Sequence, residues 1–413
     1  MSKKILIISQ NFYPEIGSAA NRSKNIYQLL KKEGYNVSVL TTEPSYPNKK
    51  MYEDERFWDD ETLNHDSQAI KRIKITNKKY SQSIFNRLIY YVEITIRMLI
   101  FLLFNKQKYD VIFVTTPPIF IGIAGLLAKG IFRGKLLLDI RDLWPESLKG
   151  VGVFHHPLVI FLVKKLEKLM YQHADSIIVN SKVYIDYIME DAGIPKQKIT
   201  FIPNGVRHSE LEMVSAKREN KIVYAGNLGL AQDVQVLKEL AKMLHNQNIS
   251  MDIIGFGMKK EEFYQFVQEE NLNNVRFFTP KTRKECLKLI SGYQAGLVAL
   301  TNNEVFEMVL PGKIIDYMTC GTPIVGAVSG YARDIICKEE AGFVSDAHNP
   351  NEMLHHILEI FEHADIQEKL SMNARNYVRS NFVWENNIKI LVGIIESHSK
   401  DHVNEDVAEV KTG

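Results

Sequence analysis

Short apolar runs alternate with segments of helical periodicity along most of the chain. In the first half, several runs have the length and composition of buried strands: KKILIIS, YNVSVLTT, YDVIFVTT, GKLLLDI, DSIIVN and KITFIPN. A helical pattern over residues 20–32 follows the first of these runs. Apolar strands separated by helices predict a parallel β-sheet with helices packed on its faces.

The same pattern starts again near residue 220, with NKIVYAGNL and a helical segment over residues 234–245. The runs SMDIIGFG, VRFFT, AGLVAL and TPIVGA follow. A chain of 413 residues is also too long for one ordinary core. We therefore predict an α/β fold of two Rossmann-like domains facing a central cleft, over residues 1–205 and 206–382, joined by a polar linker at 204–220.

Residues 84–104 form an apolar segment long enough to span a bilayer. Arg87, Glu93 and Arg97 interrupt it, and a charge at mid-bilayer is costly. The segment is predicted to be a helix that is either buried in the first domain or partly lodged in the membrane interface. The basic residues beside it that favour the second alternative are Lys78, Lys79, Lys106 and Lys108.

Two other segments lack a regular pattern. Residues 42–67 are polar and rich in Pro, Asp and Glu, which predicts a mobile loop. Residues 400–413 are charged and without apolar periodicity, which predicts a disordered tail.

Charge and cysteine content narrow the kinds of partner. The formal net charge of +2 gives no overall field for nucleic acid, so no nucleic-acid partner is expected. Cys286, Cys320 and Cys337 have no metal-ligand spacing and indicate reduced thiols in a cytoplasmic protein. The apolar run after the basic N-terminus is too short for a signal peptide.

The stretch LPGKIIDYM carries the first candidate chemistry. Pro311 and Gly312 suit the start of a helix, which places Lys313 and Asp316 on one face of its first turns. A helix N-terminus attracts phosphate, and a carboxylate beside it can accept hydrogen bonds from ribose hydroxyls. This turn could hold a nucleoside diphosphate, with phosphates on Lys313 and ribose on Asp316. A surface Lys–Asp pair without a ligand is an equal alternative.

Two further stretches follow strands of the first domain. Gly17 and Ser18 are small residues through which a ligand could approach the backbone closely, although a tight packing turn is the alternative. No G-x-G-x-x-G motif follows the first strand, which counts against a dehydrogenase. Arg141, Asp142 and Glu146 lie just past a strand end, where ligand crevices form, unless an Arg–Asp pair merely closes the strand.

Glycines also follow two strands of the second half, at Gly226, Gly255 and Gly257. Each is a weak signal by itself, because glycines end many strands. Together with Lys313, they are expected at the same edge of one sheet.

In this order, the motifs resemble glycosyltransferase family 4 over nearly the whole chain, above all bacterial members that build capsule, O-antigen or exopolysaccharide units. The matching stretches are FYPEIGSAANR, DLWPES, IPNGV, YAGNLG, GFG, PGKIIDYMTCGTPIV and FVWENN. The resemblance implies a GT-B fold with an acceptor domain, a donor domain and a C-terminal helix, about 383–399, that crosses back to the first domain. It also implies retaining transfer from a nucleotide-sugar, with a UDP-sugar favoured and no metal or cofactor.

The resemblance further implies roles for single residues. Asp316 corresponds to the ribose ligand and Lys313 to a diphosphate ligand, while Gly17 faces the phosphates. The usual arginine and lysine after the Tyr224 strand are absent. Of the family's glutamate pair, Asp316 replaces the second and Met308 stands at the first, so that Glu307 or Glu304 could substitute. The residues expected in catalysis are Asp142, Lys313 and Glu307, and those expected to bind substrate are Gly17, Ser18, Arg141, Glu146, Asn204, Gly226, Asn227, Gly255, Gly257, Asp316 and Arg333.

Two other functions remain open. A GT-B-fold sugar-nucleotide epimerase would share the phosphate seat but need an acid/base pair and no acceptor. A non-catalytic sugar-nucleotide-binding subunit would explain the broken glutamate pair. For a transferase, the acceptor is expected to be a glycan or a polyprenyl-diphosphate-linked sugar at the inner face of the cytoplasmic membrane.

Overall fold

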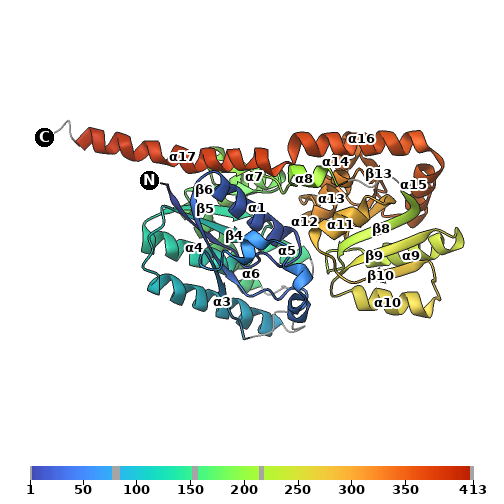
Figure 1. Cartoon of the computed structure of the whole chain (residues 1–413), viewed down its shortest axis with the longest axis horizontal. Coiled ribbons are helices and arrows are strands. Elements are labelled where there is room, and N and C mark those ends of the chain that lie inside the picture. Colours follow the sequence, from blue (N-terminus) through green and yellow to red (C-terminus); the bar gives the residue numbers. More distant parts are fainter. Residues whose placement is uncertain (1, 77–83, 151–156, 214–217, 410–413) are drawn as a thin grey trace.

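The structure is a computed structural model that describes residues 2–76, 84–150, 157–213 and 218–409. Two α/β domains lie side by side; helix α16 (Ala364–Asn381) lies along the C-terminal domain, and the long helix α17 (Trp384–Glu409) that follows it lies along the N-terminal domain (Figure 1). The predicted α/β architecture of two Rossmann-like domains with parallel sheets is confirmed.

The N-terminal sheet has the strand order β3-β2-β1-β4-β5-β6-β7, and its strand pairs are parallel. Its strands are β1 (Lys4–Ile8), β2 (Asn36–Thr42), β3 (Ile70–Ile73), β4 (Val111–Thr116), β5 (Lys135–Ile140), β6 (Ser176–Val179) and β7 (Ile199–Phe201). Its helices are α1 (Ser18–Lys32), α2 (Glu61–Asn64), α3 (Ile84–Phe104), α4 (Ile119–Phe132), α5 (Glu146–Gly150), α6 (Pro157–His173) and α7 (Val183–Ala192), with the 3-10 turns η1 (Lys49–Glu53), η2 (Glu55–Phe57) and η3 (Lys196–Lys198).

The C-terminal sheet has the order β10-β9-β8-β11-β12-β13 and is also parallel. Its strands are β8 (Glu219–Asn227), β9 (Ser250–Phe256), β10 (Val275–Phe278), β11 (Tyr293–Ala299), β12 (Ile324–Ala327) and β13 (Gly342–Val344). The remaining helices are α8 (His208–Leu211), α9 (Val234–Asn246), α10 (Lys260–Glu269), α11 (Arg283–Ile290), α12 (Glu304–Glu307), α13 (Gly312–Cys320), α14 (Gly330–Lys338), α15 (Pro350–Glu362), α16 (Ala364–Asn381) and α17 (Trp384–Glu409).

Helices cover both faces of the N-terminal sheet, which explains why its central strands are continuously apolar. Leu6 and Ile8 of β1 belong to the cluster with α3, α4 and α6. Ile5 and Ile7 of the same strand point the other way, into the cluster with α1 and α17. Alternate residues of one strand thus fill two separate layers.

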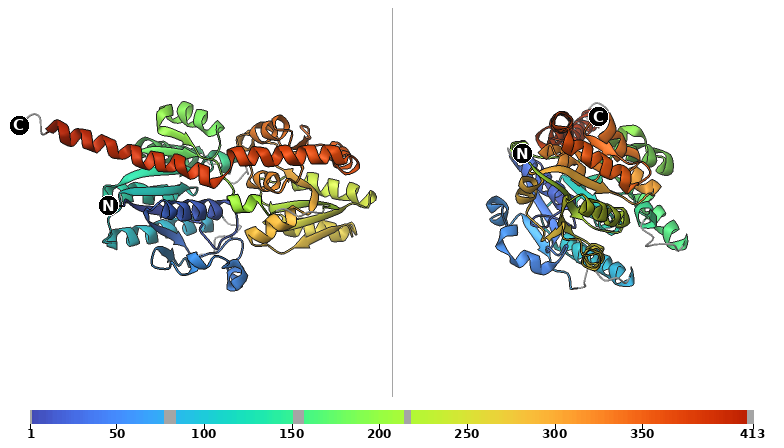
Figure 2. Two further views of the ribbon diagram at one scale, coloured as in Figure 1. Left: turned by 45° about the horizontal axis from the view of Figure 1, so that its top comes forward. Right: turned by 90° about the vertical axis from the view of Figure 1, so that its right-hand side faces the viewer.

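Helix α17 begins where the chain crosses back from the C-terminal domain and then packs along the N-terminal domain (Figure 2). Just before it, Val383 forms a β-bridge with Val206, so the linker and the return crossing lie side by side. Trp384 is buried and stacks under the Arg22 guanidinium, 5.5 Å from the ring centre. The helix extends to Glu409. The part of the tail up to that residue is therefore helical, whereas the sequence predicted a disordered tail from residue 400. The last positions, 410–413, lie outside the described residues.

The stretch 42–67, predicted to be a mobile loop, contains regular structure. It contains η1, η2 and α2, whose first turns are capped by the side chains of Asn48, Asp54 and Asp60. The buried residues that anchor it are Tyr52, Phe57 and Leu63. The polar residues that suggested a loop act as N-caps, which is why composition alone misled the prediction.

Helix α3 is two-faced. Tyr90, Ile94, Met98 and Leu102 recur every four residues and are buried, as the buried alternative required. The opposite face is exposed to solvent and apolar, with Leu103 66% exposed. Among the described helices, none combines the length and the apolarity needed to cross a membrane.

Candidate active site between the domains

A cavity of about 720 Å³ separates the two domains. The turn between β1 and α1 lines one side, and the turns that follow β8, β9 and β10, together with α13, line the other. Gly312 at the start of α13 approaches Ser18 at the start of α1 so closely that a Cβ at Gly312 would lie 3.3 Å from the Ser18 Cβ. Among the described residues, no side chain caps either helix. The Ile314 N–H of α13 donates to the Pro311 carbonyl, which leaves the N–H groups of Gly312 and Lys313, and those at the start of α1, for an anion.

Lys313 presents a buried cation with neutral partners. Its Nζ donates to the Tyr224 hydroxyl at 2.5 Å and to the Gln232 Oε1 at 2.8 Å, and it lies 3.8 Å from the centre of the Tyr224 ring. No carboxylate oxygen of the described residues lies within 4 Å of it, and burial holds the pKa of Lys313 well below its usual value. Gly226, at φ +135°, permits this approach, since its Cβ would lie 3.3 Å from the Lys313 Cε. The Lys313 ammonium thus has no counter-charge in the described part of the chain, and an anion bound beside it would supply one.

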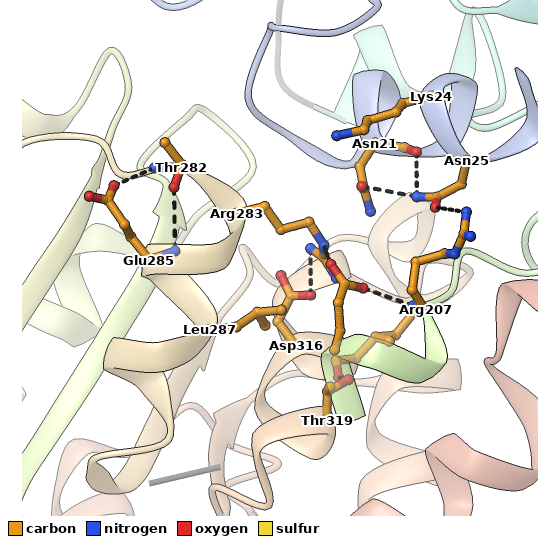
Figure 3. A network of polar contacts seen from close by, with 12 residues as sticks. Asn21, Lys24, Asn25, Arg207, Thr282, Arg283, Glu285, Leu287, Asp316 and Thr319 are labelled. Atoms are coloured by element: carbon orange, nitrogen blue, oxygen red, sulfur yellow. Dashed lines mark hydrogen bonds and ion pairs between the residues drawn. The ribbon is translucent and has the colours of Figure 1, made fainter. Parts of the chain in front are cut away.

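Asp316 does not pair with Lys313, so the simple Lys–Asp pair is ruled out. Its Oδ1 instead accepts from Arg283 at 3.0 Å, and Arg283 also donates to Glu210 at 2.5 Å (Figure 3). Burial raises the pKa of the Asp316 carboxyl, and Arg283 opposes that rise. Sequence reasoning missed Arg283 and Glu210. The stretch PKTRKE after β10 could have indicated Arg283, because Thr282 and Glu285 form a capping box that starts α11 at this arginine.

The same network continues into the linker and the N-terminal domain. The Arg207 backbone N–H donates to Glu210, and its guanidinium contacts Glu385 at 2.8 Å and Asn25 of α1 at 3.3 Å (Figure 3). The carboxylates on the C-terminal side of the cavity are therefore connected to the segment where the chain crosses between domains.

The end of β5 forms a second polar centre. Asp139 is fully buried and pairs with Arg22 at 2.7 Å, another contact that the sequence did not reveal. Arg141 lines the cavity, as expected for a substrate-binding residue. The alternative, an Arg–Asp pair that closes the strand, is not formed, because no carboxylate oxygen of the described residues lies within 4 Å of its guanidinium. Burial raises the pKa of Asp142 to about 6, but Asp142 does not line the cavity.

The structure brings many of the predicted site residues to the cavity and leaves others outside it. Those that line it are Gly17, Ser18, Arg141, Asn204, Gly226, Asn227, Gly255, Lys313 and Asp316. Those that do not line it are Asp142, Glu146, Gly257, Glu307 and Arg333.

Local contacts explain most of these exceptions. Glu146 forms ion pairs with Lys149 and Lys164 at 2.6 and 2.7 Å. Arg333 is held by Asp346 at 2.5 Å on the exposed face of α14.

Besides Asp142, described above, the remaining exceptions are Glu307 and Gly257, which have packing roles. Glu307 packs against Gly330, where a Cβ would approach its backbone oxygen to 2.3 Å. Gly257 has a tight packing role of the same kind against the Leu228 carbonyl. Among the described residues, no group of three or more His, Cys, Asp or Glu side chains could hold a metal ion.

Solved structures with the same arrangement define the class of protein. Sucrose-phosphate synthase from Thermosynechococcus elongatus superimposes with a TM-score of 0.73 at 16% identity, over 97% of this chain and all of that one. Anabaena HepE in complex with UDP and glucose gives a TM-score of 0.67 at 16% identity, over 96% of this chain and all of that one. The fold is that of the GT-B glycosyltransferases.

Two family models cover complementary parts of the chain. The glycosyl transferase 4-like domain matches residues 17–205, and glycosyl transferases group 1 matches residues 211–377. The chain therefore belongs to the GT-B glycosyltransferases that combine these two domains.

Two relatives extend this likeness over most of the chain. An uncharacterised glycosyltransferase of Methanocaldococcus jannaschii is 23% identical over 96% of this chain and 99% of its own length. WcaI of Escherichia coli, named as a colanic acid biosynthesis glycosyl transferase, is 22% identical over 79% of this chain and 84% of its own length.

Proposed function

We propose that this glycosyltransferase transfers a sugar, with retention, from a nucleotide-sugar donor to a glycan or polyprenyl-diphosphate-linked acceptor in cell-surface polysaccharide biosynthesis. The observation that carries the donor proposal is the buried Lys313 ammonium, which faces the cavity with only neutral partners. A UDP-sugar is favoured because HepE, of the same fold, is described in complex with UDP and with UDP-glucose. The WcaI name supports the polysaccharide role.

In this proposal, the donor diphosphate lies between the starts of α1 and α13. Lys313 and the free N–H groups of both helices neutralise it, and the turn at Gly17 leaves room for it. Asp316 binds the ribose through the carboxylate oxygen that Arg283 does not hold. Asn227, which lines the same side of the cavity, contributes hydrogen bonds from its amide.

Stabilisation of the leaving group is the main catalytic demand. Charge develops on the diphosphate as the anomeric C–O bond breaks, and fixed positive groups already aimed at that position lower the barrier. The acceptor hydroxyl attacks from the face that the phosphate leaves, and the departing phosphate takes its proton. No protein nucleophile is required in this scheme. Closure of the two domains would exclude water from the donor.

We also propose that the N-terminal domain rests on the membrane surface. Helix α4 contacts both α3 and α6, and all three carry exposed apolar side chains. These are Ile89, Val92, Ile96, Ile100, Leu103 and Phe104 on α3, Leu127 and Ile131 on α4, and Leu158, Phe161, Leu162 and Leu169 on α6. Exposed Lys106, Lys108, Lys165 and Lys168 border this apolar surface, as expected for contact with anionic lipid.

Lipid binding is tested by sedimentation with vesicles that contain anionic phospholipid. Leu103→Ser combined with Phe104→Ser should reduce the bound fraction severalfold, and Met372→Ser, an equally exposed change on α16, should not. Equal binding of both variants and the wild type would refute the membrane contact.

Transfer is tested by incubating the protein with a panel of nucleotide-sugars and polyprenyl-diphosphate-sugar lipids. A transferase releases nucleoside diphosphate only when an acceptor lipid is present, and the anomeric configuration of the product by NMR reports retention. Conversion of the donor sugar without any acceptor would instead identify an epimerase. Donor binding without any turnover would identify a non-catalytic subunit.

A further inference from the structure

A second cation lines the cavity from the N-terminal domain. Arg141 follows the last residue of β5, and its backbone is fixed by a hydrogen bond from its N–H to the Thr116 carbonyl at 3.0 Å. Its Nε is buried and meets no hydrogen-bond acceptor within the described parts of the chain. Among the described residues, no carboxylate oxygen lies within 4 Å of its guanidinium.

Arg22 shows what a satisfied guanidinium looks like in the same region. It donates to both oxygens of Asp139 at 2.7 to 3.1 Å and to the Pro203 carbonyl at 3.1 Å. The Asp139 Oδ2 also accepts from Thr115 at 3.2 Å. The hydrogen bonds of the buried Asp139 carboxylate thus go to other groups, and Asp139 and Asp142 act on the Arg141 cation only through their charge, without a direct ion pair.

A half-buried guanidinium without a counter-charge is costly unless a ligand supplies one. Its planar set of donors matches the oxygens of a phosphate or a carboxylate, which it binds in a bidentate manner. In the proposed function, the donor diphosphate binds to Lys313 on α13, in the other domain. Arg141 is therefore available to a different anion on the opposite wall of the cavity.

We propose that Arg141 binds an anionic oxygen group, phosphate or carboxylate, of the sugar substrate that faces the N-terminal domain. The proposal rests on the proposed function for the identity of the substrate, but the anion site itself does not depend on it. The enzyme would thereby prefer a charged sugar or sugar phosphate to a neutral sugar. The step is binding only, and no bond is made or broken by Arg141.

The experiment measures three probes by calorimetry on the full chain saturated with UDP: glucose 1-phosphate, glucuronate and neutral glucose. The wild type should bind at least one anionic probe about tenfold more tightly than glucose. Arg141→Gln should abolish this preference while UDP affinity stays within about twofold, and Arg141→Lys should restore part of it. Arg379→Gln, which changes an exposed arginine of α16, serves as the matched control.

The probe that shows the preference tells whether the anion is a phosphate or a carboxylate, and either result supports the site. Equal binding of all three probes by the wild type, or an unchanged preference in Arg141→Gln, would overturn it. If the wild type does not bind UDP, the proposed function fails, and the probes are then compared in Lys313→Met, which lacks the ammonium proposed for the diphosphate. An Arg141-dependent preference in that background would still support the anion site, and no preference would overturn it.

Discussion

Replacing Lys313 by methionine separates donor binding from folding. The change keeps the apolar stem and removes only the ammonium, which we propose as the cation for the diphosphate. Loss of one partner of a buried, hydrogen-bonded charge pair costs about 2–5 kcal/mol, so UDP affinity should fall roughly 30-fold to several thousand-fold. Isothermal titration of the purified variant with UDP measures this directly.

The free protein should tolerate this change well. Tyr224 and Gln232 already hydrogen-bond each other at 2.7 Å, so neither loses its last partner when the amine is removed. An ammonium whose pKa is lowered by burial opposes folding, so its removal relieves a cost. The unfolding free energy of Lys313→Met should therefore stay within about 1 kcal/mol of the wild-type value or rise. Lys369→Met, on the exposed surface of α16, is the matched control. A UDP affinity within threefold of wild type would refute the phosphate role of Lys313.

Three further outcomes follow from the same contacts. UDP affinity should fall as pH rises, because burial depresses the pKa of Lys313 in the free protein and a bound phosphate raises it. Calorimetry should therefore show that UDP binding takes up protons. A pH-independent affinity would contradict this prediction. Arg283→Gln leaves Glu210 and Asp316 without their cation and should lower the unfolding free energy by about 3 kcal/mol. The loss should be smaller at pH 5 than at pH 8, because the pKa of Asp316 is raised and protonation removes its unpaired charge. Equal losses at both pH values in thermal unfolding would contradict this role of Arg283. Asp139→Asn should cost about 3–5 kcal/mol in urea unfolding because Arg22 stays buried without a counter-charge, and a loss under 1 kcal/mol would show that the pair is not important for stability.

The core strands were predictable because helices cover both of their faces. Most of their side chains are apolar on both faces, and such runs stand out in the sequence. The edge strands β3 and β13 were not predicted. The sequence of β3 is IKRI, with charged residues at its two central positions, and β13 has only three residues. Both receive their structure from a neighbouring strand rather than from their own pattern.

Part of the site was predictable because its residues are close together in the chain. Lys313 and Asp316 share one helical turn, and the phosphate chemistry of that turn can be argued from spacing alone. The partners of Asp316 could not be found in this way. Arg283 is 33 residues from Asp316, and Glu210 is 73 residues from Arg283. Only the fold brings these three side chains together.

The predicted residues that lie outside the cavity show the same limit. Glu146 and Arg333 follow strand ends or helix starts in the expected way, but nearby opposite charges hold both of them elsewhere. A strand end fixes where the backbone enters the cleft. It does not fix the direction of a long side chain, which depends on the charges around it.

The central claim is that the cavity between the domains is a nucleotide-sugar donor site built around Lys313. The most direct test is a thermal-shift and calorimetric comparison of UDP, GDP, ADP and CMP with the wild-type protein. A ligand present at a hundredfold its Kd adds about 2.7 kcal/mol of stability, which is easily measured. We expect one-to-one binding of UDP, with the other nucleotides weaker. Absence of binding by all four nucleotides would contradict the donor site and, with it, the assignment of transferase chemistry to this cavity.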